Sequence, residues 1–242
     1  MNRAWAHRRL NALRRYFPNA TCRARNTLEL GRWYAERLRT RWRPGSEVYD
    51  AQFWDFHDTG DWDGFARLVL RLFPSSSIVD IGCGQGLALR ALSAADPRLT
   101  LRGFDDSPTA IARTEAHQLL VSPLDIVALT RRQALAFSRE AGPFDLALCL
   151  EVAEHLPSWH CGKLLDILTC APRLIFSAAH PNQGGTLHVN ERPASYWIAR
   201  LAERGFRLSP CDDELRAALA ALALPPWYKK NVHAFEKTDA TT

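Results

Sequence analysis

The feature that most constrains the fold is an apolar strand that runs directly into three alternating glycines. In the stretch SSSIVDIGCGQG (residues 75–86), the apolar run ends on Gly82, Gly84 and Gly86. Glycine adopts positive φ without strain and leaves room for a ligand to approach the backbone closely. Such a turn after a buried strand predicts a ligand site at the carboxyl edge of a parallel sheet.

Strand-like and helix-like stretches alternate from residue 76 onward, which indicates βαβ units and a parallel sheet. We expect strands at 78–82, 99–105, 121–126, 145–150, 173–179, 206–209 and 231–236. We expect helices at 61–73, 86–95, 107–118, 158–169, 193–204 and 212–222. The third of these strands is open to a second interpretation, in which a helix begins at 126.

Residues 1–45 are predicted to form a basic helical extension, and residues 46–242 the main domain. Twelve arginines and two glutamates give the extension a charge of +10, whereas the whole chain carries +5. Two amphipathic helices are expected there, and the second presents on one side Leu30, Trp33, Tyr34, Leu38 and Trp42. A solvated cap, an interfacial helix, an anion-binding arm and a targeting peptide share this pattern. An anionic partner (membrane surface, nucleic acid or acidic protein) is therefore one expectation, and the oligomeric state is left open.

The bulk composition excludes several classes of protein. No run of eighteen apolar residues exists, so we expect no transmembrane helix, and no long apolar segment predicts a secretory signal. The six cysteines contain no C-x-x-C pair, and Cys83 and Cys149 lie in apolar stretches, as buried free thiols do. We therefore expect a cytoplasmic protein without a disulfide framework.

Three kinds of ligand compete for the glycine turn. A triphosphate-binding loop requires a lysine after its last glycine, and none follows Gly86. A dinucleotide fingerprint requires a third small residue where this chain has Leu87. Asp80, two residues before the first glycine, would repel a pyrophosphate but can pair with an ammonium group. The turn therefore favours a cationic ligand without phosphates.

Three motifs then resemble those of class I S-adenosylmethionine-dependent methyltransferases. VDIGCGQG resembles motif I, and LRGFDDSP resembles the second motif, in which an acid, here Asp105, binds both ribose hydroxyls. FDLALCLEVAEHLP (144–157) resembles motif IV, and Asp125 is the candidate near the adenine amine. The resemblance implies that S-adenosyl-L-methionine is the cofactor. The implied contacts are Asp80, Gly82, Cys83, Gly84, Gly86, Asp105, Asp106, Ser107, Asp125, Leu150 and Glu151.

The same resemblance implies a Rossmann-like, doubly wound α/β fold. Its seven-stranded, mostly parallel sheet has an antiparallel last strand, and the helical extension precedes it. No metal-ligand spacing is visible in the sequence, so we expect metal independence.

The methyl acceptor would bind beside the cofactor, and an alcohol or phenol acceptor needs a base. The candidate bases are His188, His155 and His180. We expect His188 to point toward the transferred methyl group, because residues 182–192 form a polar excursion at the carboxyl edge. Asn190 and Glu191 in this excursion are expected to hold the acceptor. Aromatic residues before the core are expected to wall the pocket: Tyr49, Phe53, Trp54 and His57.

The leading functional hypothesis is O-methylation of a small molecule, such as a sugar, a lipid-linked compound or a secondary metabolite. Motif IV reads CLEV and lacks the N/D-P-P-[YF] tetrapeptide that the family associates with nitrogen methylation. One alternative is an RNA or protein methyltransferase recruited by the arginine-rich N-terminus. Another is a non-catalytic module that binds the cofactor. A nicotinamide dehydrogenase is excluded because its dinucleotide fingerprint requires a small residue at the position of Leu87.

Overall fold

The computed structural model describes residues 18–42, 47–57 and 59–238. The strands are β1 (Ser77–Ile81), β2 (Thr100–Asp105), β3 (Val121–Pro123), β4 (Leu146–Leu150), β5 (Arg173–Ser177), β6 (Phe206–Leu208) and β7 (His233–Lys237). The first helices are α2 (Pro18–Trp42), α3 (Ala51–His57), α4 (Trp62–Leu72), α5 (Leu87–Ala95) and α6 (Pro108–Glu115). They are followed by α7 (Arg131–Glu140), α8 (Ser158–Ile167), α9 (Ala194–Ala202), α10 (Asp212–Ala221) and α11 (Pro226–Lys230). Two short 3-10 helices span Ala153–His155 and Leu168–Cys170.

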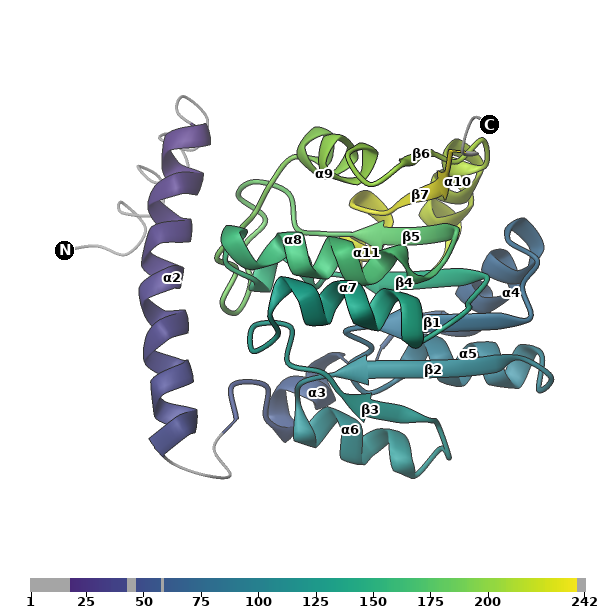
Figure 1. Cartoon of the computed structure of the whole chain (residues 1–242), viewed down its shortest axis with the longest axis horizontal. Coiled ribbons are helices and arrows are strands. Elements are labelled where there is room, and N and C mark those ends of the chain that lie inside the picture. Colours follow the sequence, from purple (N-terminus) through teal and green to yellow (C-terminus); the bar gives the residue numbers. More distant parts are fainter. Residues whose placement is uncertain (1–17, 43–46, 58, 239–242) are drawn as a thin grey trace.

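The strands form one sheet in the order β3-β2-β1-β4-β5-β7-β6 (Figure 1). Strands β1 to β5 pair in parallel, and β7 runs antiparallel to both of its neighbours. The predicted doubly wound fold with an antiparallel last strand is therefore confirmed. The chain winds outward from β1 in one direction and from β4 in the other. The crevice outside the carboxyl ends of β1 and β4 is thus the switch point at which ligands bind in such sheets.

Helices cover both faces of the sheet because its central strands are apolar on both sides. Helices α7, α8 and α9 pack on one face, and α4, α5 and α10 pack on the other. In β4, Ala147 and Cys149 join the first core, whereas Leu146 and Leu148 join the second, as the alternation of side chains along a strand requires. This double core holds the strand ends rigidly in place.

The expected third strand is present, but it is shorter than predicted, and no helix begins at residue 126. Strand β3 stops at Pro123, and the next helix begins only at Arg131. Thr130 and Gln133 form a capping box at that point, and this local hydrogen bonding fixes the start of the helix. The sequence pattern also does not predict α3 or α11, because helices of 7 and 5 residues are too short to show a period.

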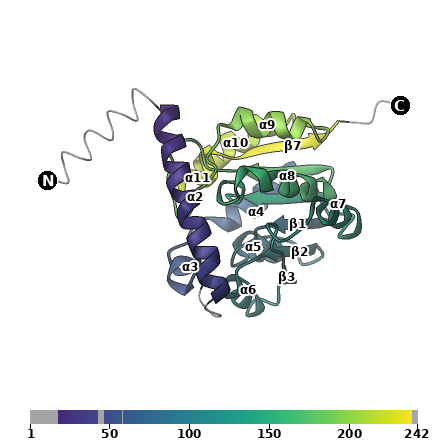
Figure 2. The same cartoon turned by 60° about the vertical axis from the view of Figure 1, so that its left-hand side comes forward.

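Helix α2 stands across the edge of the sheet at which the parallel strands end (Figures 1 and 2). Near one end of the helix Arg25 pairs with Glu191, and toward the other Arg37 pairs with Asp125. Between these ion pairs, buried Trp33 packs with apolar residues of the 182–192 excursion. The second expected helix of the basic extension therefore packs against the domain. The first expected helix lies outside the described residues.

In the described part of the chain, no helix combines the length and the apolar character that a membrane crossing needs.

Candidate active site

A cavity of about 1620 Å³ lies at the carboxyl edge of the sheet. The glycine turn and the ends of β2 and β4 line it on one side, and α2, α3 and residues 183–188 line it on others. Aromatic side chains are frequent in its walls: Trp33, Tyr49, Phe53, Trp54, Trp227 and Tyr228. Ligand pockets commonly measure about 300–1,000 Å³, so this cavity has room for two ligands side by side.

The glycine turn has the backbone geometry that its sequence predicts. Gly82, Gly84 and Gly86 have φ values of +77°, +53° and +77°, in the region where residues with a side chain are strained. A Cβ atom on Gly84 would lie 2.7 Å from the ring of Trp54. The turn is therefore packed directly against the aromatic wall, at a distance that only glycine permits.

Asp80 lies beneath this turn with one unsatisfied oxygen. The residue is 3% exposed, and its Oδ1 atom has no hydrogen-bond partner among the described residues. Burial and the nearby charge of Asp105 raise the pKa of Asp80 to about 7. A buried carboxylate without a partner is costly unless a cation pairs with it. Asp80 is therefore suited to hold an ammonium group.

Asp105 ends β2 and faces the same turn. Its Oδ2 atom accepts a hydrogen bond from the backbone N–H of Gly84 at 2.8 Å, and its Oδ1 accepts from Ser107 N–H at 2.9 Å. Burial raises the pKa of Asp105, and burial together with the charge of Asp105 raises the pKa of Asp106 to about 6. Three acids thus gather at one end of the cavity, where a cationic ligand would relieve their repulsion.

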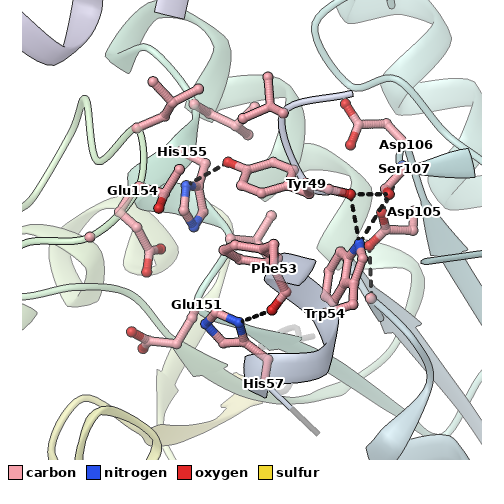
Figure 3. Close-up of a pocket in the computed structure, with 18 of the residues that line it drawn as sticks. Tyr49, Phe53, Trp54, His57, Asp105, Asp106, Ser107, Glu151, Glu154 and His155 are labelled. Carbon is pink, nitrogen blue, oxygen red and sulfur yellow. Dashed lines mark hydrogen bonds between the residues drawn. The ribbon is translucent and has the colours of Figure 1, made fainter. Parts of the chain in front are cut away.

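Helix α3 and the residues before it form an aromatic wall between the two ends of the cavity (Figure 3). The Trp54 indole N–H donates to the backbone carbonyl of Tyr49 at 2.9 Å and to Ser107 Oγ at 3.3 Å. The ring of His57 stacks on Phe53 with a centroid separation of 4.1 Å. The residues expected to wall the pocket therefore line this cavity.

The motif after β4 begins at a strained residue. Glu151 has a φ of +57°, which is uncommon for a residue with a side chain and is often found at functional sites. Its carboxylate accepts hydrogen bonds from Asn231 Nδ2 at 3.0 and 3.1 Å and from Gln183 Nε2 at 3.0 Å. Glu151 is thus held at the cavity wall by residues from two distant segments.

Glu154, His155 and His188 meet at another wall of the cavity. One potential ligand atom from each residue lies within 4.8 Å of the other two. Glu154 is fully buried, and neither carboxylate oxygen has a hydrogen-bond partner among the described residues. Burial and the charge of Glu151 raise the pKa of Glu154. Burial and the neighbouring His188 lower the pKa of His155 to about 3, so its imidazole is neutral near pH 7.

Both imidazoles are oriented through their Nδ1 atoms. His155 Nδ1 lies 3.0 Å from the hydroxyl of Tyr49, and His188 Nδ1 lies 3.2 Å from Glu191 Oε1. Glu191 also accepts from two backbone N–H groups at 2.7 and 2.6 Å and pairs with Arg25 of α2. Burial opposes ionisation of Glu191, but these hydrogen bonds lower its pKa overall. An ionised carboxylate therefore stands behind His188.

Other candidates from the sequence occupy different positions. Asn190 and Glu191 lie behind the cavity wall, and Asn190 Nδ2 lies 3.1 Å from Cys161 Sγ. His180 is also absent from the lining of the cavity. Asp125 lines it but is paired with Arg37 at 2.7 Å. Cys83, Ser107 and Leu150 also line the cavity, whereas Gly86, the last glycine of the turn, does not.

Sequence reasoning did not single out Arg25, Arg37 or Glu154 as site residues. The sequence did contain a signal for Glu154, because this residue lies three positions after Glu151 within EVAEH. For the two arginines no local signal existed, because their carboxylate partners lie 166 and 88 residues away in the sequence.

Part of the chain is similar in sequence to known methyltransferases. Residues 79–170 match a family model described as a methyltransferase domain. A ubiquinone biosynthesis O-methyltransferase of Xanthomonas campestris pv. campestris is 29% identical over 151 residues, which cover 58% of this chain and 56% of that protein. The protein of the same name from Cupriavidus pinatubonensis is 34% identical over 135 residues, covering 51% and 47%. The chain therefore spans about half the length of the curated relatives it matches.

Solved structures share the fold at low identity. The sugar N-methyltransferase KedS8 from Streptoalloteichus sp ATCC 53650 superposes with a TM-score of 0.58 at 14% identity, covering 81% of this chain and 96% of that one. The plantazolicin methyltransferase BpumL, in complex with a triazolic desmethylPZN analog and SAH, gives 0.54 at 16% identity, covering 90% and 97%. The matched segment contains the glycine turn, Asp105 and the EVAEH element. At residues 79–170 the chain therefore matches a methyltransferase domain, and its fold is shared with solved methyltransferases.

Proposed function

We propose that the chain binds S-adenosylmethionine in this cavity and transfers its methyl group to an oxygen atom of a small molecule. The observation that carries the proposal is the buried carboxylate of Asp80 beside the glycine turn, whose Oδ1 atom has no hydrogen-bond partner among the described residues. Asp80 would accept hydrogen bonds from the α-ammonium group, and Asp105 from the ribose hydroxyls. When bound, the cofactor supplies a sulfonium methyl group, which is the electrophile of the reaction.

The chain's own groups align the reactants and exclude water. The aromatic wall of Phe53 and Trp54 and the indole of Trp33 on α2 cover the cavity, which limits competing hydrolysis. An acceptor hydroxyl must lose its proton during transfer. The polar groups arranged to assist at the cavity wall are Glu154, His155 and His188.

Oxygen of a small molecule is favoured over the alternatives for two reasons. The curated relatives are named O-methyltransferases, and the walls are rich in aromatic side chains that suit an apolar or aromatic acceptor. An RNA or protein substrate guided by α2 has less support, because Arg25 and Arg37 are already paired with carboxylates of the domain. A sugar, lipid-linked or secondary metabolite remains the proposed acceptor class.

The test is an incubation of the full chain with methyl-labelled cofactor and a panel of phenols, catechols, sugar alcohols and RNA. We expect label in one small-molecule class, with one S-adenosylhomocysteine released per methyl group. In calorimetry, Asp105→Ala should weaken cofactor affinity about 10- to 100-fold, because it removes charge-assisted hydrogen bonds. No cofactor binding by the unmodified chain would refute the proposal. Cofactor binding without transfer to any acceptor would favour the non-catalytic module.

A cytoplasmic location and an anionic partner for residues 1–45 also belong to this proposal. The location is supported by the six cysteines, all of which are free. The partner is supported by the charge of the segment, and it predicts association with anionic vesicles or nucleic acid that weakens as salt rises. Equal association of a chain that lacks residues 1–17 would count against it.

A further inference from the structure

We propose that Glu154, His155 and His188 bind a divalent first-row transition-metal ion, which holds the hydroxyl oxygen of the methyl acceptor. The role of the ion in catalysis rests on the proposed function. The ion site itself rests on the side chains alone. It departs from the metal independence that the sequence predicts.

The donor set and its spacing suit such an ion. Two imidazole nitrogens and one carboxylate oxygen lie within 4.8 Å of one another. Ligand atoms around one ion with bonds of about 2.1 Å stand roughly 3–3.5 Å apart, so side-chain movements of about 1 Å would complete the site. Imidazole ligands favour Zn²⁺, Fe²⁺ or Ni²⁺, whereas Mg²⁺ prefers oxygen ligands. The set therefore selects a transition metal.

The burial of Glu154 is the observation that a purely structural role does not explain. The residue is fully buried, and neither carboxylate oxygen makes a hydrogen bond of normal geometry within the described part of the chain. Its nearest polar neighbours are the carboxyl group of Glu151, which would repel its charge, and the backbone of Ala179. Buried carboxylates are normally hydrogen-bonded, paired or bound to a metal. An ion between Glu154 and the two imidazoles would satisfy the charge and the lone pairs together.

The two histidines are held in the manner of metal ligands. Each uses Nδ1 toward a partner, Tyr49 for His155 and Glu191 for His188. This leaves Nε2 of His188 to bind an ion, whereas the ring of His155 also hydrogen-bonds with the backbone of Thr186 and Leu187, which an ion would replace. Metal-binding histidines almost always have such a partner on the second nitrogen, and it fixes the direction of the ring. Glu191 is itself held by Arg25 and by backbone N–H groups, so His188 is supported from α2.

The position of the group leaves room for an acceptor. Glu154, His155 and His188 all line the cavity that also contains the glycine turn. Three protein ligands leave coordination positions open on the cavity side, as in catalytic metal sites. An acceptor hydroxyl bound there loses its proton to solvent at lower pH, because the ion stabilises the oxyanion. The oxyanion then forms the new O–C bond, the C–S bond breaks, and its electron pair stays on the sulfur of the thioether product.

Ion binding can be measured without any methyl transfer. The untagged full chain is stripped with EDTA, dialysed, and titrated with ZnSO₄ or MnCl₂ in a calorimeter. We expect one equivalent to bind, and His188→Ala and Glu154→Gln to weaken the affinity at least about 100-fold. Glu191→Gln should weaken it about 10- to 100-fold through the orientation of His188. The matched control is His180→Ala, a histidine outside the cavity, which should bind the ion as the unmodified chain does.

The outcomes separate this proposal from the proposed function. Cofactor affinity of the stripped chain, measured by calorimetry, should stay within about twofold of that of the ion-loaded chain, because Asp80 and Asp105 lie at the other end of the cavity. Turnover should fall at least about 100-fold on stripping and return with added MnCl₂ or ZnSO₄. If no ion binds while the cofactor binds and turnover survives EDTA, the ion site is refuted and the transferase stands. A loss of turnover in His188→Ala would then assign His188 as a direct base.

Discussion

At the scale of single residues, Asp80 has the clearest consequence for cofactor binding. Its pKa is about 7 in the free protein because it is buried near Asp105. An ammonium group pairs with the ionised form, so below pH 7 the carboxyl must release a proton when the cofactor binds. We therefore expect affinity for S-adenosylmethionine to fall as the pH falls, approaching tenfold per pH unit below about pH 6. Calorimetry between pH 5 and 7.5 measures this slope.

The control for this prediction is Asp80→Asn, which keeps the shape of the side chain and removes its charge. At pH 7.5 the variant should bind the cofactor about 10- to 100-fold more weakly, and it should lose most of the pH dependence. Identical pH profiles for the two proteins would show that Asp80 does not pair with the ammonium group.

At the scale of elements, helix α2 is tied to the 182–192 excursion by the Arg25–Glu191 ion pair and by the packing of Trp33. The carboxylate of Glu191 is 0% exposed and its partner Arg25 is 22% exposed, so removal of the arginine leaves a buried charge poorly compensated. Arg25→Ala should lower the free energy of unfolding by about 1–3 kcal/mol. It should also speed amide hydrogen exchange in residues 182–192. Urea unfolding and exchange mass spectrometry measure the two effects.

Arg32→Ala on the same helix is the matched control. The side chain of Arg32 is 68% exposed, and it pairs with Glu29 of α2 itself, so its loss should change stability by less than about 0.5 kcal/mol. Equal effects of the two substitutions on exchange in residues 182–192 would contradict the assigned role of Arg25.

At the scale of the whole molecule, the cofactor and acceptor ends of the cavity depend on different parts of the chain. The cofactor end is built mainly on β1 and β2, and Arg37 of α2 reaches Asp125 there. On the acceptor side, Trp33 of α2 packs against the 182–192 excursion. A chain that lacks residues 1–42 should still be stabilised by saturating S-adenosylmethionine, with a rise in Tm of about 5–10 °C at 100 times Kd. Its turnover should fall at least about 10-fold, because the acceptor is no longer enclosed.

A chain that lacks only residues 1–17 is the comparison for this deletion. It keeps Arg25, Trp33 and Arg37, and it should retain turnover within about twofold. If the longer deletion abolishes folding, α2 is part of the folding core. If both deletions leave turnover unchanged, α2 does not enclose the acceptor.

The sequence alone predicted the sheet, the glycine turn and the acid after β2, because each depends on residues that are close together in the chain. Strand β4 is apolar throughout because both of its faces are covered, and that pattern is visible in five residues. Positive φ at Gly82, Gly84 and Gly86 follows from the absence of a Cβ atom. Local sterics and periodic burial act over a few residues and therefore leave a readable pattern.

Only the tertiary structure decided how α2 crosses the strand ends and which polar side chains meet beneath it. His188 joins Glu154 and His155 across more than thirty residues, and Arg25 reaches Glu191 across 166. Neither pairing could be recognised from a spacing in the sequence. The number of residues between two partners does not determine how far apart they lie in the folded protein. The cavity wall is thus determined by packing between distant segments, which no local pattern records.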